Sequence, residues 1–262
     1  MGSVTRVIVL DDGSPADVVG FRALGVVIDS LMDVPDAAWR VVGGWMVRAW
    51  VEGSAVGAAR PTVDVDVALL ASRGGGKVEE VPQRLRDAGL LPTDEPFRLR
   101  GPDDLLVDLL VPPGASRADP PRLGTHIVFE ARGSRFGFEM PPEPVSVRLD
   151  DDRLGFPTVR LAAALVLKAV VLGVARPGRT EVDAVDVARL LSVVRDGPAE
   201  AISDLRSHSR RRDVHEGLQR LETLFGSGED PGAVLVARET DDATALTAVA
   251  DARWLLGQAR ST

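Results

Sequence analysis

The spacing of hydrophobic residues in the first part of the chain predicts both helices and strands. From Asp17 to Met32, apolar residues recur at steps of three and four, which indicates one amphipathic helix. Short apolar runs that end at Gly, Pro and polar turns indicate strands, with a surface helix among them at 78–90. We place the strands at residues 6–10, 39–42, around Asp64, 97–100, 105–111, 125–130 and 135–139.

From about residue 157 onward the pattern changes to helical spacing alone. Strands followed by a run of helices favour an α+β fold. We therefore expect a division of the chain near residues 153–157, into segments 1–155 and 156–262. The predicted C-terminal helices are 159–174, 181–194, 198–206, 213–224 and 240–259.

Composition narrows the class of protein. The 262 residues include no cysteine, which excludes disulfides, thiolate zinc sites and cysteine nucleophiles and is compatible with the cytoplasm, where we expect the protein. The N-terminus lacks the pattern of a signal peptide. The longest apolar stretch, 161–175, contains Lys168 and is shorter than the roughly 20 residues of a membrane span. We predict no membrane segment.

The net charge of -8 disfavours a surface that binds nucleic acid everywhere. A local basic groove is still compatible with it, and the compact basic run 207–212 is either a contact for RNA phosphates or a solvated helix start.

Two short motifs follow one another in the first half of the chain. Gly43 and Gly44 lie between the strand 39–42 and a helix-like run 45–51, so their backbone N–H groups and the helix N-terminus suit a triphosphate. About twenty residues later, Asp64 and Asp66 leave the same face of a strand, while Val63, Val65 and Val67 point into a core. Two neighbouring carboxylates repel each other unless a divalent cation lies between them, so the pair predicts a metal site. The alternative is two solvated acids on an edge strand.

A third acid, Asp108, lies on a later apolar strand. We interpret it as a shared metal ligand or as the base that takes a proton from an attacking hydroxyl, the alternative being an outward-facing strand residue. Arg60, just before the Asp64 strand, either meets phosphate or pairs with an acid.

Several charged residues in the predicted helices after residue 157 are also candidates for the site. Lys168 is one of only two lysines and lies in a helix that is apolar nearly all round. Either its ammonium reaches water or it serves as a cation for phosphates. Thr180-x-x-Asp183 has the form of a capping box, whereas Asp186 one turn later is harder to explain as a cap. Gly178 and Arg179 precede that helix and are expected to line a cleft.

Together these motifs resemble the AbiEii-type toxins, including the MenT-like mycobacterial ones, within the polymerase-beta-type nucleotidyltransferase superfamily. The resemblance covers about 150 residues. One departure is Trp45, which stands where the family often has a small residue, so a serine that contacts phosphate is absent. The matching segments are VVGG (41–44), RPTVDVDV (60–67), VDLL (107–110), LVLKAVVL (165–172) and RTEVDAVDVARLL (179–191).

The resemblance implies a mixed nucleotidyltransferase-like sheet in 1–155, flanked by helices, and a helical domain in 156–262 that completes a nucleotide cleft. It implies that Gly43, Asp64 and Asp66 hold nucleotide and Mg²⁺ or Mn²⁺. It further implies that Lys168 contacts phosphate and that Asp183 or Asp186 completes the site.

The activity implied is transfer of NMP from an NTP to RNA, notably the tRNA 3′ end, by the toxin of a toxin–antitoxin pair. The GGW start and the Asp-x-Asp pair also resemble lincosamide and aminoglycoside nucleotidyltransferases, so modification of an antibiotic hydroxyl is an alternative. A third hypothesis is a non-catalytic nucleotide-binding protein on the same fold, which the three intact acids disfavour.

Overall fold

The computed structural model describes residues 6–11, 13–52, 54, 56–57, 59–116, 118–172 and 179–260. In this part, nine strands form a mixed sheet in the order β1-β10-β11-β2-β3-β6-β5-β4, with β9 also beside β6, and β7 and β8 form a separate pair. The strands are β1 (Arg6–Val9), β2 (Trp39–Val42), β3 (Asp64–Leu69), β4 (Leu91–Pro92), β5 (Arg98–Arg100), β6 (Leu106–Val111), β7 (Arg122–Leu123), β8 (His126–Ile127), β9 (Phe129–Glu130), β10 (Glu143–Leu149) and β11 (Asp152–Thr158).

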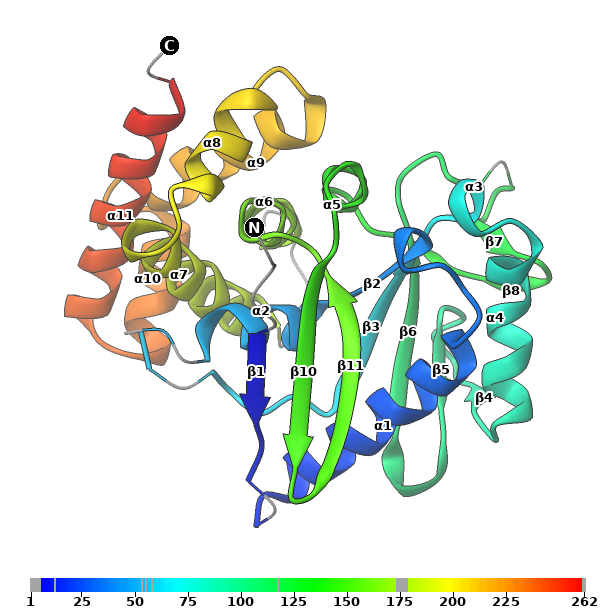
Figure 1. Cartoon of the computed structure of the whole chain (residues 1–262). Coiled ribbons are helices and arrows are strands. Elements are labelled where there is room, and N and C mark those ends of the chain that lie inside the picture. Colours follow the sequence, from blue (N-terminus) through cyan, green and yellow to red (C-terminus); the bar gives the residue numbers. More distant parts are fainter. Residues whose placement is uncertain are drawn as a thin grey trace.

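The helices lie on both faces of this sheet and beyond its end. Figure 1 shows α7 to α11 gathered on one side of the molecule, while α1 lies against the strands. The described helices are α1 (Pro15–Leu31), α2 (Gly43–Val51), α3 (Ala71–Gly74), α4 (Gly76–Asp87), α5 (Ser134–Glu139), α6 (Leu161–Leu172), α7 (Thr180–Asp196), α8 (Glu200–Ser207), α9 (Arg212–Phe225), α10 (Pro231–Glu239) and α11 (Asp242–Arg260).

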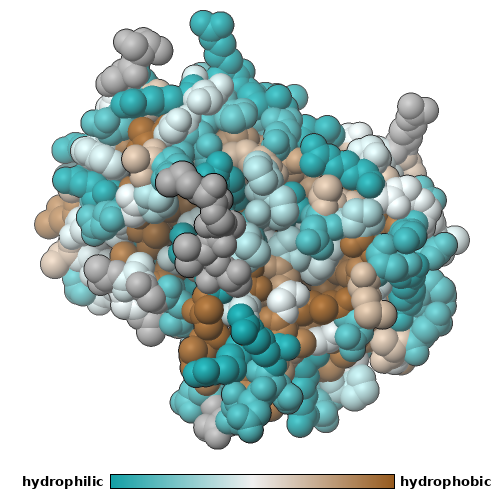
Figure 2. All heavy atoms as spheres, in the orientation of Figure 1, coloured by the Kyte–Doolittle hydropathy of each residue, from teal (hydrophilic) through white to brown (hydrophobic). Residues whose placement is uncertain are grey.

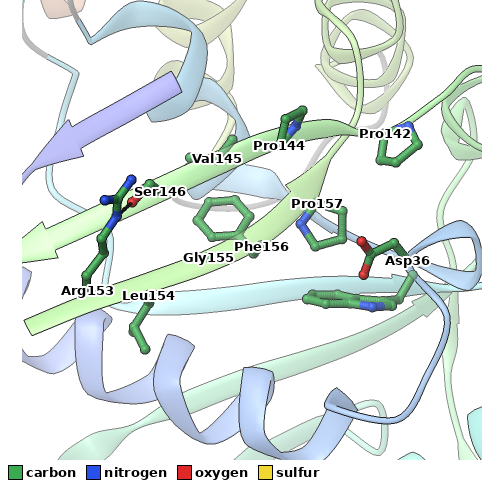
Figure 3. Close-up of a pocket in the computed structure, with 11 residues that line it drawn as sticks. Asp36, Pro142, Pro144, Val145, Ser146, Arg153, Leu154, Gly155, Phe156 and Pro157 are labelled. Atoms are coloured by element: carbon green, nitrogen blue, oxygen red, sulfur yellow. Dashed lines mark hydrogen bonds between the residues drawn. The ribbon is translucent and has the colours of Figure 1, made fainter. Parts of the chain in front are cut away.

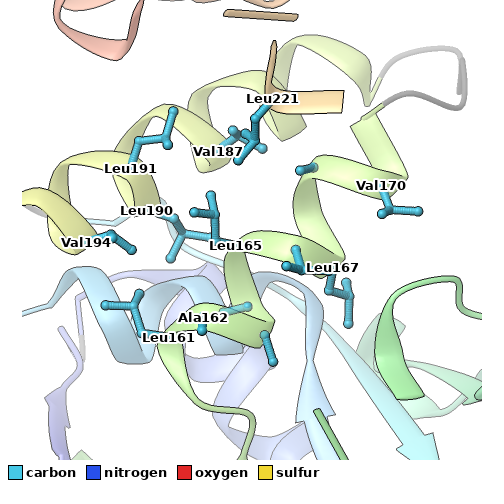
Figure 4. Packing of buried hydrophobic residues seen from close by; sticks show 14 of the residues in the cluster. Leu161, Ala162, Leu165, Leu167, Val170, Val187, Leu190, Leu191, Val194 and Leu221 are labelled. Atoms are coloured by element: carbon cyan, nitrogen blue, oxygen red, sulfur yellow. The ribbon is translucent and has the colours of Figure 1, made fainter. Parts of the chain in front are cut away.

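The two faces of the central strands belong to different hydrophobic clusters. Val65 and Val67 of β3 pack with α1 and α4 on one face. Ala68 of β3 and Leu110 of β6 pack with α2 and α6 on the other face. Figure 4 shows Leu165 of α6 facing Val187 and Leu190 of α7 within this second cluster. The second face also carries the even-numbered acids of β3 and β6, so α6 and α7 form the opposite wall of any site there.

The predicted α+β class, with a mixed sheet flanked by helices and followed by C-terminal helices, is confirmed. The expected division into 1–155 and 156–262 stays a prediction: position 155 falls inside β11, and the helical segment after it begins with α6. Residues 173–174 of the predicted helix 159–174, and Gly178, lie outside the described residues.

Some predicted elements are wrong or were missed. Segment 135–139 is not a strand but lies in the short helix α5, and strands β10 and β11 and helix α10 were not predicted. Val63 precedes β3 and is 37% exposed, so it does not point into the core as Val65 and Val67 do.

The surface is mostly hydrophilic in the view of Figure 2, with hydrophobic side chains gathered in its lower middle part. Two exposed valines, Val7 and Val9, belong to the edge strand β1. Within the described residues, no helix has both the length and the apolar character needed to span a membrane.

Candidate active site

Strand pairing brings the three predicted acids to one pocket. β3 runs parallel to β6 with Asp66 opposite Asp108, so both side chains leave the same face at the same level. Asp64 precedes Asp66 by two residues and shares that face. The pocket has a volume of about 130 Å³. It is lined by nine of the predicted residues, and Asp186 is not among them: Gly43, Gly44, Arg60, Asp64, Asp66, Asp108, Lys168, Arg179 and Asp183.

The glycine turn lies against Asp66. β2 pairs antiparallel with β3 and places Val42 opposite Asp66, so the start of α2 meets the acid directly. Gly43 has a φ of +62°, and a Cβ there would lie 1.8 Å from Asp66 Oδ2. The bare N–H groups at the N-terminus of α2 therefore open into the same pocket as the carboxylates, as an anion site requires.

Trp45, the residue after the two glycines, is part of the hydrophobic core. Its side chain is fully buried and makes an edge contact with Phe156, with ring centroids 6.4 Å apart. The residue after the two glycines thus belongs to the hydrophobic core and not to the lining of the pocket.

We expect Gly43→Ala to destabilise the protein more than Gly75→Ala. Both glycines have a φ near +60°, where a residue other than glycine is strained by about 1–3 kcal/mol. A Cβ at Gly75 would meet nothing within 4 Å, whereas at Gly43 it would collide with Asp66. Such overpacking adds roughly 1–3 kcal/mol, measurable by urea denaturation. Equal midpoints for the two variants would contradict the close approach of Gly43 to Asp66.

Two arginines bind two of the three acids. Arg98 of β5 lies opposite Asp108 of β6, and its Nε and Nη2 each donate to one carboxylate oxygen at 2.7 Å. Asp64 accepts hydrogen bonds from Arg179 Nη2 at 2.8 Å and from Thr62 Oγ1 at 3.0 Å. Arg179 lies in the pocket as predicted, whereas Arg98 was missed.

A signal for Arg98 was present in the sequence. The strands 97–100 and 105–111 were both predicted, and the short Gly-Pro-Asp-Asp connection between them is typical of a hairpin turn. An antiparallel hairpin centred on residue 103 places Arg98 opposite Asp108.

The third acid, Asp66, has a raised pKa although Lys168 and Arg179 act to lower it. Burial and the charges of Asp64 and Asp108 raise the pKa of Asp66 to about 7. Burial also raises the pKa of Asp64, but the charge and hydrogen bond of Arg179 outweigh it and hold that pKa below its ordinary value. Asp64 and Asp66 thus differ because, of these two, only Asp64 accepts a hydrogen bond from an arginine among the described residues.

Carboxylate oxygens are the ligands that a hard divalent cation prefers. Within the described ranges, no three His, Cys, Asp or Glu side chains are grouped closely enough to hold a metal ion, and the two arginines instead hold Asp64 and Asp108. The raised pKa of Asp66 nevertheless indicates an excess of negative charge, which a cation such as Mg²⁺ relieves. The metal site therefore stays a prediction.

Lys168 lies in a buried ionic cluster. Its Nζ donates to Asp183 Oδ1 at 2.9 Å and to Asp186 Oδ2 at 2.8 Å, and Arg60 Nη2 lies 3.7 Å from the same Asp186 oxygen. The side chain of Lys168 is only 6% exposed, so the interpretation that its ammonium reaches water is wrong. The contact of Lys168 with phosphate stays a prediction.

The structure places Asp183 in the acidic first turn of α7, as predicted, but the helix starts one residue earlier than the predicted capping box requires. Helix α7 begins at Thr180, with Arg179 at the N-cap and no side-chain hydrogen bond to the cap. The carboxylate of Asp183 accepts from Lys168 instead. Both Asp183 and Asp186 are buried, and Asp186 lies behind the pocket at 1% exposure. The two acids therefore join α7 to α6 through one ammonium group.

Two other pockets are not lined by Asp64, Asp66 or Asp108. The larger, about 480 Å³, lies between the β10–β11 hairpin and Trp39; Figure 3 shows Phe156 and several prolines around it, with Arg153 next to Ser146. Another, about 340 Å³, is lined in part by arginines from the basic run. Arg211 there pairs with Glu139, so part of that basic charge is compensated. RNA contact by this run stays a prediction.

Comparisons with known proteins found similar solved structures but no matching family. No family model and no curated protein match the chain. An antigenic nucleotidyltransferase-like protein from Paracoccidioides brasiliensis is 14% identical, with a TM-score of 0.43, over 81% of this chain and 89% of that protein. The lincosamide antibiotic adenylyltransferase LnuA, lincomycin-bound, is 19% identical, with a TM-score of 0.36, over 66% of this chain and 96% of that one. The functional argument therefore rests on the side chains of the pocket.

Proposed function

We propose that this chain is a nucleotidyltransferase that moves NMP from an NTP to a hydroxyl group of an acceptor and releases pyrophosphate. The observation that carries this proposal is the convergence of Asp64, Asp66 and Asp108 on the glycine turn at the start of α2, in one pocket. This chemistry requires positioning of phosphates, neutralisation of their charge and removal of one proton. A Mg²⁺ or Mn²⁺ ion held by Asp64 and Asp66, with Asp108 as a further ligand, would supply the charge neutralisation.

The protein groups divide the remaining tasks. Backbone N–H groups at Gly43 and Gly44 bind the phosphates that leave. The attacking oxygen forms a bond to the α-phosphorus while the bond from that phosphorus to the bridging oxygen breaks. Asp108 accepts the proton of the attacking hydroxyl, and burial favours this role because it raises the pKa of Asp108 despite the opposing effect of Arg98.

The pocket must open to admit an NTP. Its volume of about 130 Å³ is below the roughly 300–1,000 Å³ of small-molecule sites. The guanidinium of Arg179 occupies the space beside Asp64, and its side chain is 43% exposed. We infer that Arg179 leaves Asp64 and binds the triphosphate, for which an arginine is well suited.

The resemblance to AbiEii-type toxins supports a finer proposal. Its motif residues on β2, β3, β6, α6 and α7 lie in or directly behind one pocket. On this basis, the acceptor is RNA such as the tRNA 3′ end, and the protein is a cytoplasmic toxin with a cognate antitoxin.

The proposal is tested with purified protein, Mg²⁺, each α-labelled NTP and total tRNA. We expect label on tRNA from the wild type and from Asp94→Asn, an exposed acid outside this pocket, but not from Asp64→Asn. Parallel reactions with antibiotics test the alternative, because a product that gains the mass of one NMP would favour it. Failure of the wild type to bind any NTP would contradict the proposal.

A further inference from the structure

Two phenylalanines form an aromatic pair at the pocket. Phe97, just before β5, and Phe129 of β9 both line it, and their ring centroids lie 5.4 Å apart at an interplanar angle of 50°. Phe97 is partly buried, whereas Phe129 is 45% exposed. Among the large hydrophobic side chains that are exposed in the described part of the chain, Phe129 is the one aromatic. An exposed ring at a pocket is a surface on which another planar ring stacks.

The pair lies on a defined side of the acids. Phe129 pairs with Leu110, which follows Asp108 by two residues and shares its face. Phe97 precedes Arg98, the residue that binds Asp108. In the strand order β2-β3-β6-β5, the glycine turn after β2 is on one side of the acids and both phenylalanines are on the other.

The in-line geometry of phosphoryl transfer indicates which side receives the acceptor and which side receives the leaving group. The attacking and leaving oxygens lie roughly opposite each other across the transferred phosphorus. If pyrophosphate leaves toward the glycine turn, the acceptor hydroxyl arrives from the side of Asp108, where the two rings lie. The group next to that hydroxyl then meets two aromatic surfaces and the Arg98–Asp108 pair.

We propose that Phe97 and Phe129 stack on the terminal nucleobase of an acceptor whose ribose hydroxyl attacks the NTP. This inference rests on the proposed nucleotidyltransferase function and adds to it the part of the acceptor that is recognised. Bases stack readily on aromatic side chains, and each such contact contributes roughly 1–3 kcal/mol by alanine substitution. An acceptor without a nucleobase beside its hydroxyl lacks the planar ring that these two residues would stack on.

The first experiment measures binding without transfer. The probe is a short oligoribonucleotide with 2-aminopurine as its 3′-terminal base. The fluorescence of 2-aminopurine falls when it stacks on an aromatic ring. We expect quenching by the wild type and by Phe129→Tyr, which keeps a ring. In Phe129→Leu we expect loss of quenching and roughly 5- to 100-fold weaker binding. Leu246→Ala, at an exposed apolar residue far from the pocket lining, serves as the matched control. Equal quenching by wild type and Phe129→Leu would overturn the proposal.

The second experiment separates the acceptor base from the NTP base. With an unlabelled oligoribonucleotide, Phe129→Leu should raise KM for the oligoribonucleotide and leave KM for the NTP unchanged. With an oligoribonucleotide that ends in an abasic ribose, wild type and variant should have the same KM. A rise in KM for the NTP alone would overturn the assignment to the acceptor. Absence of transfer by the wild type to every acceptor would instead contradict the proposed function, while the fluorescence result would still decide the stacking.

Discussion

Replacing Lys168 by methionine should lower the free energy of unfolding by roughly 3–5 kcal/mol, as expected when one partner of a buried ion pair is removed. Methionine fills much the same space, but it leaves Asp183 and Asp186 without the ammonium that both of them bind. Burial of two carboxylates that have lost this ammonium is costly, and Arg60, at 3.7 Å from one Asp186 oxygen, is too distant for a good hydrogen bond. Urea denaturation followed by circular dichroism measures this loss.

The other lysine supplies the matched control. Lys77 is exposed and bonds to the backbone oxygen of Asp33, so Lys77→Met should change stability by less than about 0.5 kcal/mol. A triple variant, Lys168→Met with Asp183→Asn and Asp186→Asn, should recover much of the lost stability because it removes the buried charges together. If Lys168→Met alone is as stable as the wild type, the ionic cluster does not join α6 to α7 as described.

This cluster illustrates what sequence could and could not predict. The apolar helix around Lys168 was predicted, because four apolar neighbours on either side are a local signal. The partners of its ammonium come from α7 and lie 15 and 18 residues away in the chain. Helical periodicity places Asp183 and Asp186 on one side of α7, but it does not say which side chain of another helix meets them.

The strands show the same division between local and tertiary signals. Period-two alternation correctly predicted that Asp64 and Asp66 share a face, and the parallel pairing with β6 then added Asp108 at the same level. Strands β10 and β11 were missed because Pro144 and Pro157 indicate loops. The structure places these two prolines opposite each other, so a single position of the hairpin contains both missing N–H donors.

The wrong strand at 135–139 has a tertiary cause. Phe136 and Phe138 alternate as in a half-buried strand, yet both are buried in the six-residue helix α5. Asp213 of α9 accepts the backbone N–H of Phe136, and a Cβ at Gly137 would lie only 2.4 Å from Val159. Contacts with segments that follow later in the chain therefore decide the conformation of these residues.

The second prediction concerns Asp66, whose replacement should lower activity and raise stability. Asp66→Asn should reduce nucleotidyl transfer roughly 100-fold or more, because it removes a predicted ligand of the metal. The same change should stabilise the metal-free protein near neutral pH. The folded-state pKa of Asp66 is about 7, against an ordinary value of 3.8. The carboxylate therefore destabilises the folded protein at any pH high enough to ionise it.

The sign and the pH range follow from proton linkage. Between the two pKa values the folded protein binds more protons than the unfolded chain, so the contribution of Asp66 to stability falls as pH rises from about 4 to about 7. The advantage of Asp66→Asn over the wild type should therefore be absent near pH 4 and reach roughly 1–4 kcal/mol above pH 7. Thermal unfolding across this pH range, in the presence of a chelator, measures it.

The effect of Mg²⁺ on the melting temperature tests whether Asp66 binds a metal ion or has only a structural role. A divalent cation that binds beside Asp66 neutralises the repulsion with Asp64 and Asp108, so Mg²⁺ should raise the melting temperature of the wild type more than that of Asp66→Asn. Asp94→Asn, at an exposed acid outside the pocket, should behave like the wild type in both pH and Mg²⁺ dependence. Two results together would contradict this prediction: a wild-type melting temperature that Mg²⁺ does not change, and equal stability of wild type and Asp66→Asn above pH 7. They would show that Asp66 neither destabilises the fold nor binds the cation. The opposite outcome would mean that the folded protein retains an unfavourable charge at this position because the reaction requires it.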